Sequence, residues 1–193
     1  MKQADLTRQR IMRASLELFA AQGYQATTTP DIARHAGLAE GTMYSHFAGK
    51  QDLLNELYRS AAAWAVQLVR QADVAGGNPR DKLAQLAGLL VHDAGRDPAV
   101  VRLFFFQDYT VLLDERSRAS AREFRGGLET LVAQGKAEGL VRTGGVDALA
   151  AAWLGVVRVA MERVVTREWG TNSGGVNVCR DAAWAAIAQP GTA

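Results

Sequence analysis

Hydrophobic residues recur every three or four positions along most of the chain, which is the spacing of one face of an α-helix. No stretch alternates apolar and polar residues for long enough to predict a strand. The pattern therefore predicts an all-α protein. The first helix is expected over residues 5–22, with an apolar stripe formed by Ile11, Ala14, Leu18 and Phe19.

The stretch after Gly23 predicts a short helix followed by a tight turn. Thr29 can cap the N-terminus of this helix, and Pro30 suits the first helical position because a missing N–H costs nothing there. Gly37 is expected at the C-terminal end, where glycine tolerates the left-handed backbone that stops a helix.

A second short helix is expected over residues 39–47, with Met43 and Phe47 turned inward at i, i+4 spacing. Its outward face is small, hydroxyl-bearing and aromatic: Gly41, Thr42, Tyr44, Ser45 and His46. Such a face suits a helix that is pressed against a nucleic-acid backbone.

Five longer helices are expected after these, separated by turn-forming residues: 50–72, 79–95, 114–138, 148–169 and 176–188. Asn78 can cap the second of them, and Asp97-Pro98 repeats that start signal ahead of the aromatic segment VVRLFFFQDYTVLL. Gly126-Gly127, inside a long helix, predicts either a bend or a close contact with another helix.

Composition adds mainly exclusions. The formal net charge is +2, and residues 1–50 carry the whole excess, with six Lys or Arg against four acids. That is a modest footprint for a polyanionic partner. The single cysteine, Cys179, excludes an internal disulfide framework and fits a reducing cytoplasm. The most apolar window, residues 148–161, is shorter than the ~20 residues that cross a bilayer, so a buried helix is expected instead.

A series of residues at fixed spacing, without a gap, runs through the first quarter of the chain: Ile11, Ala14, Leu18-Phe19-Ala20, Gly23-Tyr24, Thr28-Thr29, Asp31-Ile32-Ala33, Ala36-Gly37, Gly41-Thr42, Tyr44, Phe47, Lys50 and Asp52-Leu53-Leu54. This series resembles the motif of the TetR family of bacterial transcriptional regulators. The resemblance implies an N-terminal three-helix helix-turn-helix DNA-binding domain over residues 1–50. It also implies a C-terminal helical domain for effector binding and dimerisation over residues 51–193.

The resemblance further implies DNA-contact roles for Thr28, Thr29, Leu38, Gly41, Thr42, Tyr44, Ser45, His46 and Lys50. Residues 38–46 would enter the major groove, where Gly41 lies close to a base edge and Thr42 reads a base. The remaining hydroxyls, His46 and Lys50 would contact phosphates. Two positions depart from the family pattern: Ala39 replaces the usual Ser or Thr cap, and Glu40 places an acid where a neutral or basic residue is common.

Plainer interpretations exist for several of these residues. Tyr44 could pack over the first helix, and His46 could be a surface histidine without a role. The three arginines of the first helix, Arg8, Arg10 and Arg13, are expected on a solvated face.

The C-terminal half offers two further features. The helix over 148–169 is apolar on more than one side, at Leu149, Trp153, Val156, Val157 and Val164. Together with the helix over 176–188, it would form a four-helix seam in a homodimer, as the family resemblance also implies. The alternative is that both are ordinary core helices of a monomer.

A small-molecule site is the other expectation. Its candidate residues are Trp64, Phe105, Gln107, Tyr109, Trp153 and Arg158. The alternative is an aromatic core without a ligand. Arg158 stands out because a charge inside an apolar window needs a partner, whether an internal acid, a second subunit or an anionic ligand.

Catalysis has little to build on in this chain. The three histidines are not spaced for a metal site, and Gly49-Lys50 lacks the upstream glycine and the following Ser or Thr of a phosphate-binding loop. We therefore expect no enzyme, no metal and no cofactor. The expected function is a ligand-responsive transcriptional regulator, a repressor by the family's commoner mode. It would bind a palindromic operator in double-stranded DNA as a homodimer and be released by a small-molecule effector. The alternative is a helical small-molecule-binding or interaction protein whose DNA-binding module no longer functions.

Overall fold

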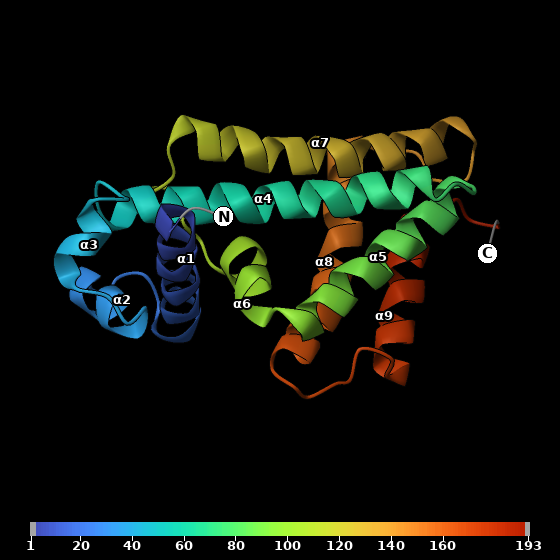
Figure 1. Cartoon of the computed structure of the whole chain (residues 1–193). Helices are drawn as coiled ribbons and strands as arrows, with labels where there is room; N and C mark the ends of the chain where they lie inside the picture. Colours follow the sequence, from blue (N-terminus) through green and yellow to red (C-terminus); the bar gives the residue numbers. More distant parts are fainter. Residues whose placement is uncertain (1–2, 192–193) are drawn as a thin grey trace. The chain divides into compact units, whose positions relative to one another are not determined.

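The computed structural model describes residues 3–191, and every regular element in that range is a helix (Figure 1). In chain order these are α1 (Gln3–Gln22), α2 (Thr29–His35), α3 (Glu40–Tyr44), α4 (Lys50–Val74), α5 (Pro79–Arg96), α6 (Pro98–Val101), the π-helix η1 (Arg102–Phe106), α7 (Glu115–Ala137), α8 (Val146–Val165) and α9 (Gly174–Ala185). Within the same range, an isolated antiparallel bridge joins Val141 and Ala188, without a strand on either side. The predicted all-α class is confirmed.

The helices group into two compact units. Unit 1 comprises the chain up to Ala61 together with Ala99–Ser120, and unit 2 comprises Ala62–Pro98 together with the chain from Ala121 onward. Both α4 and α7 therefore contribute residues to each unit. The units do not follow the expected division after residue 50, because a segment from the middle of the chain belongs with the N-terminal helices.

Unit 1 has one hydrophobic core, which α1, α2, α3 and the start of α4 share with the Ala99–Ser120 segment. Polar contacts tie that segment down as well. The buried Asn55 side chain donates to the Leu112 carbonyl (3.1 Å) and accepts from the Asp114 amide (2.7 Å). Gln107 donates to the Phe19 carbonyl at the end of α1 (3.1 Å). Because buried polar groups are costly unless paired, these bonds help to fix the segment within unit 1.

The two short helices of unit 1 differ in detail from the sequence-based expectation. Thr28, not Thr29, caps α2: its hydroxyl accepts from the Asp31 amide, and the Asp31 carboxylate accepts from the Thr28 amide. This reciprocal arrangement is a capping box, and the acid three residues after Thr28 is the signal that the prediction missed. Gly37 has φ +65°, as expected for a residue that ends a helix.

The helix α3 covers only Glu40–Tyr44, so the expected span of residues 39–47 was too long. At its start, Ala39 provides no side-chain hydrogen bond, in line with the missing cap. At its end, the Ser45 hydroxyl donates to the Thr42 carbonyl (2.7 Å), and such local bonds compete with helix continuation.

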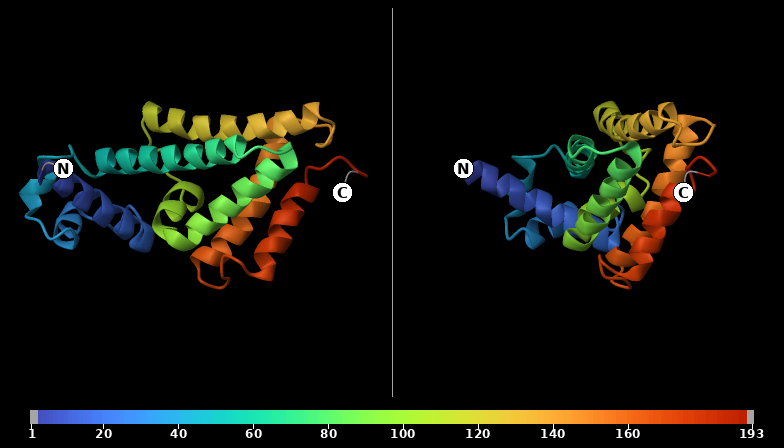
Figure 2. Two further views of the ribbon diagram at one scale, coloured as in Figure 1. Left: turned by 45° about the vertical axis from the view of Figure 1, so that its right-hand side comes forward. Right: turned by 90° about the vertical axis from the view of Figure 1, so that its right-hand side faces the viewer.

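Unit 2 is built on α5, α8 and α9, which pack against one another (Figures 1 and 2). Asn78 and Asp81 form a second capping box, with Pro79 in the first turn of α5 as predicted. A Cβ on Gly127 of α7 would lie 3.1 Å from Val69 of α4, so the glycine marks a close helix contact, one of the two expected explanations.

The helix α8 has two different faces. Its buried face comprises Leu149, Ala150, Trp153, Val157, Ala160, Met161, Val164 and Val165, and its exposed face includes Ala148, Ala151, Ala152, Gly155 and Val159. Arg158 is exposed as well, so within the single chain this charge does not lie in an apolar interior, and its partner stays a prediction. The expectation overlooked that one side of this apolar helix faces outward.

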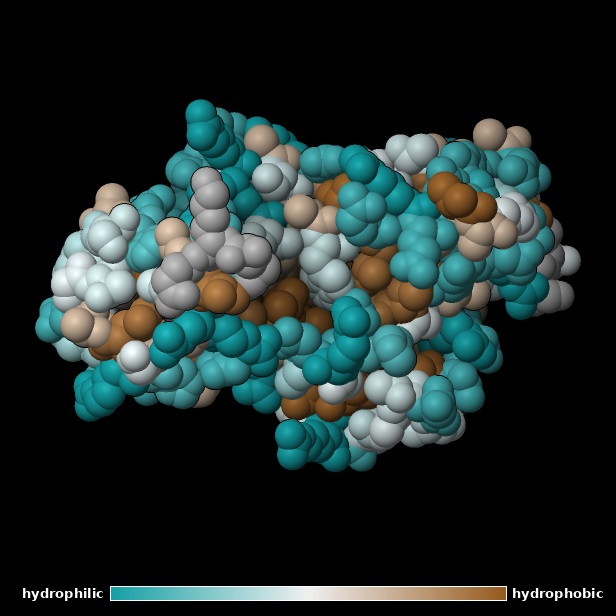
Figure 3. Space-filling view, in the orientation of Figure 1, coloured by the Kyte–Doolittle hydropathy of each residue, from teal (hydrophilic) through white to brown (hydrophobic). Residues whose placement is uncertain are grey.

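The surface is otherwise largely polar on the face shown in Figure 3, with hydrophobic side chains in scattered patches. Among the described residues, the large hydrophobic side chains that are well exposed are Leu6, Tyr44, Val74, Val111, Val159 and Val178. No helix within residues 3–191 is long and apolar enough to span a bilayer.

Candidate nucleic-acid interface

The helix α3 presents one anchored face and one open face. Met43 and Phe47 are buried in the core of unit 1, as predicted from their spacing. Gly41, Tyr44 and Ser45 are exposed, while Thr42 and His46 are half-buried at the edge of the same surface. A Cβ added at Gly41 would meet no atom within 4 Å, so the fold of the chain itself does not require glycine there.

Tyr44 connects the open face of α3 to the start of α2. Its side chain is 54% exposed, and its hydroxyl lies 3.0 Å from the Thr29 hydroxyl. Tyr44 is thus exposed and bonded to α2, in line with its expected outward position on α3. The two hydroxyls bring the N-terminus of α2 and the outer face of α3 onto one surface, which both could present to a polyanion.

The N-terminus of α2 also carries an ionised acid. Asp31 accepts hydrogen bonds from the Thr28 hydroxyl and amide, and these bonds, with the nearby Arg34 guanidinium, hold the pKa of Asp31 below its usual value of 3.8. Arg34 pairs with the same carboxylate. The first turn of α2 is thus ordered by its own side chains before any ligand arrives.

Arg10 fixes the turn that joins α2 and α3. Its guanidinium donates to the Ala36 carbonyl (2.6 Å) and to the Gly37 carbonyl (3.2 Å). These carbonyls belong to the unsatisfied C-terminal end of α2, where a cation is favourable. Arg10 is exposed, as sequence analysis expected, but its carbonyl contacts were not predicted, because a contact between residues far apart in the chain leaves no local pattern.

Lys50, at the first position of α4, fixes the loop between α1 and α2. Its ammonium donates to the carbonyls of Tyr24 (2.8 Å) and Thr27 (2.9 Å), and it lies 4.2 Å from the centre of the Tyr24 ring. Two of its three N–H groups therefore serve the protein itself. The expected phosphate contact of Lys50 stays a prediction, and the third N–H group would make it.

Arg8 ties α1 to α4. It pairs with Glu56 (2.9 Å), which also pairs with Arg59 (2.9 Å), and its guanidinium lies 5.0 Å from the centre of the Phe47 ring. The hydrogen bond from Arg8, followed by that from Arg59, keeps the pKa of Glu56 below its usual 4.5. Arg8 is therefore a structural residue of the module, and its contacts with Glu56 and Phe47 were not expected for a residue of a solvated face.

The residues that open α3 occupy different surroundings. Leu38 packs against the core of unit 1, so its apolar side chain supports α3 from below. Glu40 is exposed in the first turn of α3, where an acid is favourable for the helix dipole. The Glu40 carboxylate is thus unfavourable for binding a DNA phosphate and not for the stability of the fold.

The six residues expected to bind a small molecule are divided between the two units. Phe105, Gln107 and Tyr109 belong to unit 1, whereas Trp64, Trp153 and Arg158 belong to unit 2. Gln107 and Tyr109 line a wide, open surface pocket of about 410 Å³ beside the α1–α2 loop, and the Tyr109 hydroxyl donates to the Gln107 side chain. Burial raises the pKa of Tyr109 to about 12.

The unit 2 members of that set have other surroundings. Trp64 donates its indole N–H to the buried Asp93 carboxylate of α5 (2.7 Å), and Trp153 is only 1% exposed. Trp153 thus has the environment of a core residue, in keeping with the aromatic-core alternative. In the part of the chain that the structure describes, no cluster of three His, Cys, Asp or Glu could hold a metal ion.

The geometry of unit 1 defines a class of protein. Two short helices meet at a glycine turn, and the second, braced by α1 and α4, exposes a polar face; this is a helix-turn-helix DNA-binding module. Residues 11–57 match the family model for bacterial regulatory proteins of the tetR family. The N-terminal quarter of the chain is thus similar to the DNA-binding domain of TetR family regulators.

Several known proteins are similar to it. The HTH-type transcriptional repressor KstR2 of Mycobacterium tuberculosis is 33% identical over 84 residues, which cover 44% of this chain and 42% of that repressor. The regulator SrpR of Pseudomonas putida is 47% identical over 58 residues, covering 30% of this chain and 27% of SrpR. The matches to these curated relatives thus cover less than half of their lengths.

The fold agrees over almost the full chain with solved structures. A TetR family transcription regulator from Marinobacter aquaeolei VT8 superposes with a TM-score of 0.83 at 20% identity, over 96% of this chain and 97% of that one. The MbdR regulator from Azoarcus sp. CIB superposes with a TM-score of 0.75 at 26% identity, over 92% and 97%. The FadR regulator of Bacillus subtilis, solved in complex with stearoyl-CoA, superposes with a TM-score of 0.74 at 19% identity, over 93% and 97%.

Proposed function

We propose that the protein is a cytoplasmic transcriptional repressor that binds a palindromic operator as a homodimer. The open face of α3 is the main support for the proposal, because its exposed residues have no role in the core. The hydrogen bonds of Arg10 and Lys50 fix the turn and the loop around α2 that position this face. Sequence would be read in the major groove by this helix, with Thr42 as the base reader and Gly41 allowing close approach to a base edge.

The remaining residues of the surface would anchor the DNA backbone. Thr28 and Thr29 stand at the N-terminus of α2, and Tyr44, Ser45 and His46 stand at the end of α3. Hydroxyls, a histidine and helix N-termini are groups that contact phosphates, and such contacts set register without reading sequence. Lys50 would add one N–H to them.

The outer faces of α8 and α9 support a homodimer. On α8, Ala151, Gly155 and Val159 follow one another at i, i+4, i+8 and are exposed. On α9, Val178 is 67% exposed, and Ala182 and Ala185 lie on the same side. Small and apolar residues let helices approach closely, and a second copy would bury both stripes in a four-helix seam. A two-fold dimer would address half-sites ~34–36 Å apart.

Regulation by a small molecule completes the proposal. KstR2 is a repressor by name, and the FadR structure contains stearoyl-CoA, so relatives in sequence and fold include a repressor and a ligand-binding regulator. A ligand that binds better to a form with another spacing of the recognition helices would lower the affinity for DNA by that difference.

The sharpest test uses Gly41→Ala beside Gly126→Ala, with binding to the DNA upstream of the gene measured by fluorescence anisotropy. Neither added Cβ would meet an atom within 4 Å, and both lie inside helices, so both variants should be at least as stable as the parent. Gly41→Ala should lose DNA affinity tenfold or more, at about 1–3 kcal/mol for a lost base contact, while Gly126→Ala keeps it.

An interaction protein with a silent DNA-binding module is the competing function. Glu40 favours it, because an exposed acid at the start of the recognition helix repels phosphates. A parent protein whose affinity for that DNA is the same as for unrelated DNA, and which is unaffected by Gly41→Ala, would support this alternative.

A further inference from the structure

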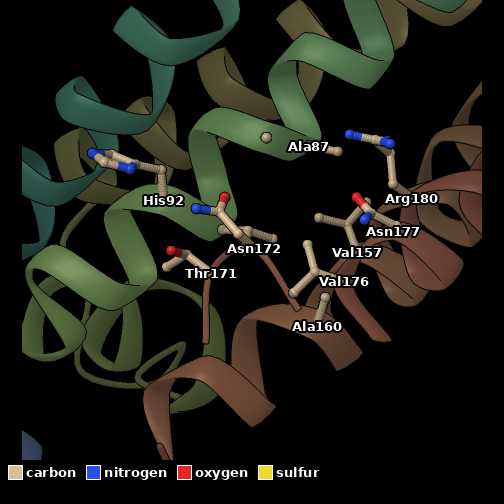
Figure 4. Close-up of a pocket in the computed structure, with 11 residues that line it drawn as sticks. Ala87, His92, Val157, Ala160, Thr171, Asn172, Val176, Asn177 and Arg180 are labelled. Atoms are coloured by element: carbon tan, nitrogen blue, oxygen red, sulfur yellow. The ribbon is translucent and has the colours of Figure 1, made fainter. Parts of the chain in front are cut away.

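A cavity of about 120 Å³ lies within unit 2, between α5, α8 and α9 (Figure 4). None of the residues expected to bind a small molecule lines it. Its lining comprises Ala87, Gly88, Val91, His92, Val157, Ala160, Thr171, Asn172, Val176, Asn177 and Arg180. The site was missed by sequence analysis because its residues come from three helices and one loop, and none forms a recognisable motif.

The lining divides by chemistry. Val91 of α5, Val157 of α8 and Val176 of α9 are buried and give the cavity an apolar floor. Arg180 and Asn177, one turn apart on α9, stand at one side of it, and Asn172 lies toward the other (Figure 4). Convergent polar groups over an apolar floor are what a small ligand needs for orientation and affinity.

Arg180 sets the charge of the expected ligand. Its ion pair with the neighbouring Asp181 is long, 3.9 Å at Nε, and the Asp181 side chain is 79% exposed, so that pair holds the guanidinium weakly. A guanidinium matches the planar, two-oxygen geometry of a carboxylate, and the amide of Asn177, one turn away on α9, can donate to the same group.

The volume sets the size of the ligand. An apolar cavity of about 150 Å³ in a protein holds benzene, so this smaller but partly open cavity suits at most a single ring or a short branched chain and no long acyl chain. A charged head at Arg180 could extend toward the open side, while the apolar part covers the valines.

The cavity and the outer stripe of α8 lie on different sides of that helix. Val157 and Ala160 face the cavity, whereas Ala151, Gly155 and Val159 are exposed. At 100° per residue, the two groups lie nearly opposite each other around the helix. On α9 the cavity residues Val176 and Arg180 are likewise well separated from Val178 and Ala182, so a dimer formed through the outer stripes leaves the cavity accessible.

We propose that this cavity binds a small organic carboxylate whose apolar part is one ring or a short branched chain. As an effector site it rests on the proposed function, but its ligand chemistry rests on the cavity alone. The binding and the DNA response are therefore measured separately.

Isothermal titration of the full chain with benzoate tests the binding. Benzamide, which keeps the shape without the charge, and acetate, which keeps the charge without the ring, should each bind at least about tenfold more weakly. Arg180→Gln should weaken benzoate by about tenfold or more, while Arg125→Gln, the same change at an exposed position on α7, should not.

A blocking variant separates loss of the site from loss of the fold. A Cβ at Gly88 would meet no atom within 4 Å, so Gly88→Leu can fill the cavity mouth without a clash at its first carbon. It should abolish benzoate binding while the helical circular dichroism and the urea midpoint stay near those of the parent.

The proposal would be overturned if benzoate does not bind at millimolar concentration. It would also be overturned if Arg180→Gln and Gly88→Leu both bind benzoate as tightly as the parent protein. Benzoate binding that depends on Arg180, in a protein without affinity for operator DNA, would leave the cavity site standing and refute the regulatory function. Operator binding without any benzoate binding would refute the cavity site and leave the regulatory function standing.

Discussion

The Lys50 ammonium lies 2.8 Å from the carbonyl oxygen of Tyr24, a residue 26 positions earlier in the chain, and 4.2 Å from the centre of its ring. Lys50 is expected to contact a DNA phosphate, and its contact with Tyr24 means that it also stabilises the fold. It also joins the first residue of α4 to the loop that leads into the helix-turn-helix.

Replacement of Lys50 by Met should therefore destabilise the fold, because two carbonyls lose their donor while the side-chain stem is kept. We expect a loss of about 1–3 kcal/mol in the free energy of unfolding by urea, whereas Arg125→Met on the exposed face of α7 should change little. An unchanged urea midpoint, with a salt slope of DNA binding lower by about 1, would instead mean that Lys50 acts only as a phosphate contact.

Arg10→Met should loosen the turn between α2 and α3. The Ala36 and Gly37 carbonyls lose a charged donor, so we expect about 1–3 kcal/mol lower stability together with weaker DNA binding. The matched variant Arg13→Met breaks an exposed pair with Glu17 and should cost less than about 1 kcal/mol. Equal effects of the two variants on unfolding would rule out a special role for Arg10.

Much of unit 1 could be predicted from the sequence, and the reason is local. Helix periodicity, the glycine turn and the inward Met43 and Phe47 depend on residues a few positions apart. The contacts of Arg10 and Lys50 join residues 26 positions apart, and that of Gln107 with Phe19 spans 88, so no window of sequence contains both partners. The π-helix at Arg102–Phe106 had no sequence signal that we used.

Ala39→Ser should stabilise the protein. Ala39 has the extended backbone of an N-cap, φ −69° and ψ 143°, but offers no acceptor to the first amides of α3. A serine hydroxyl there should add about 1 kcal/mol to the free energy of unfolding. The same change at Ala119, exposed within α7, should add nothing, because serine inside a helix competes with the backbone. A gain at Ala119 equal to that at Ala39 would contradict the capping explanation.

Glu56 should contribute to acid sensitivity. Since its pKa in the folded protein lies below the usual 4.5, its stabilising effect is present above that pH and is lost as the pH falls through the lowered pKa. Glu56→Gln should thus unfold at lower urea than the parent at about pH 6, and the gap should narrow at about pH 3.5. Glu138→Gln, at an exposed position, serves as the control, and a gap that widens in acid would contradict the sign.

Val159→Asp and Val178→Asp should disrupt the proposed dimer. Each places a charge on an exposed apolar stripe, at 46% and 67% exposure, where a second copy would bury it. Light scattering after gel filtration should show a dimeric parent and a monomeric or weakly associating variant. Val111→Asp, at a position 93% exposed in unit 1, should leave the mass unchanged. A parent that is monomeric at micromolar concentration would exclude this interface.

The make-up of unit 1 has a consequence for protein engineering. Leu103, Tyr109 and Leu113 are part of the same core as Ile11 and Phe19, although they follow them by some ninety residues. A fragment that ends at Ala61 would leave that core open to water and should fold poorly. The DNA-binding module therefore cannot be transferred to another protein as one contiguous segment. A chimeric regulator also needs Ala99–Ser120 from the same parent, so that the core of unit 1 is complete.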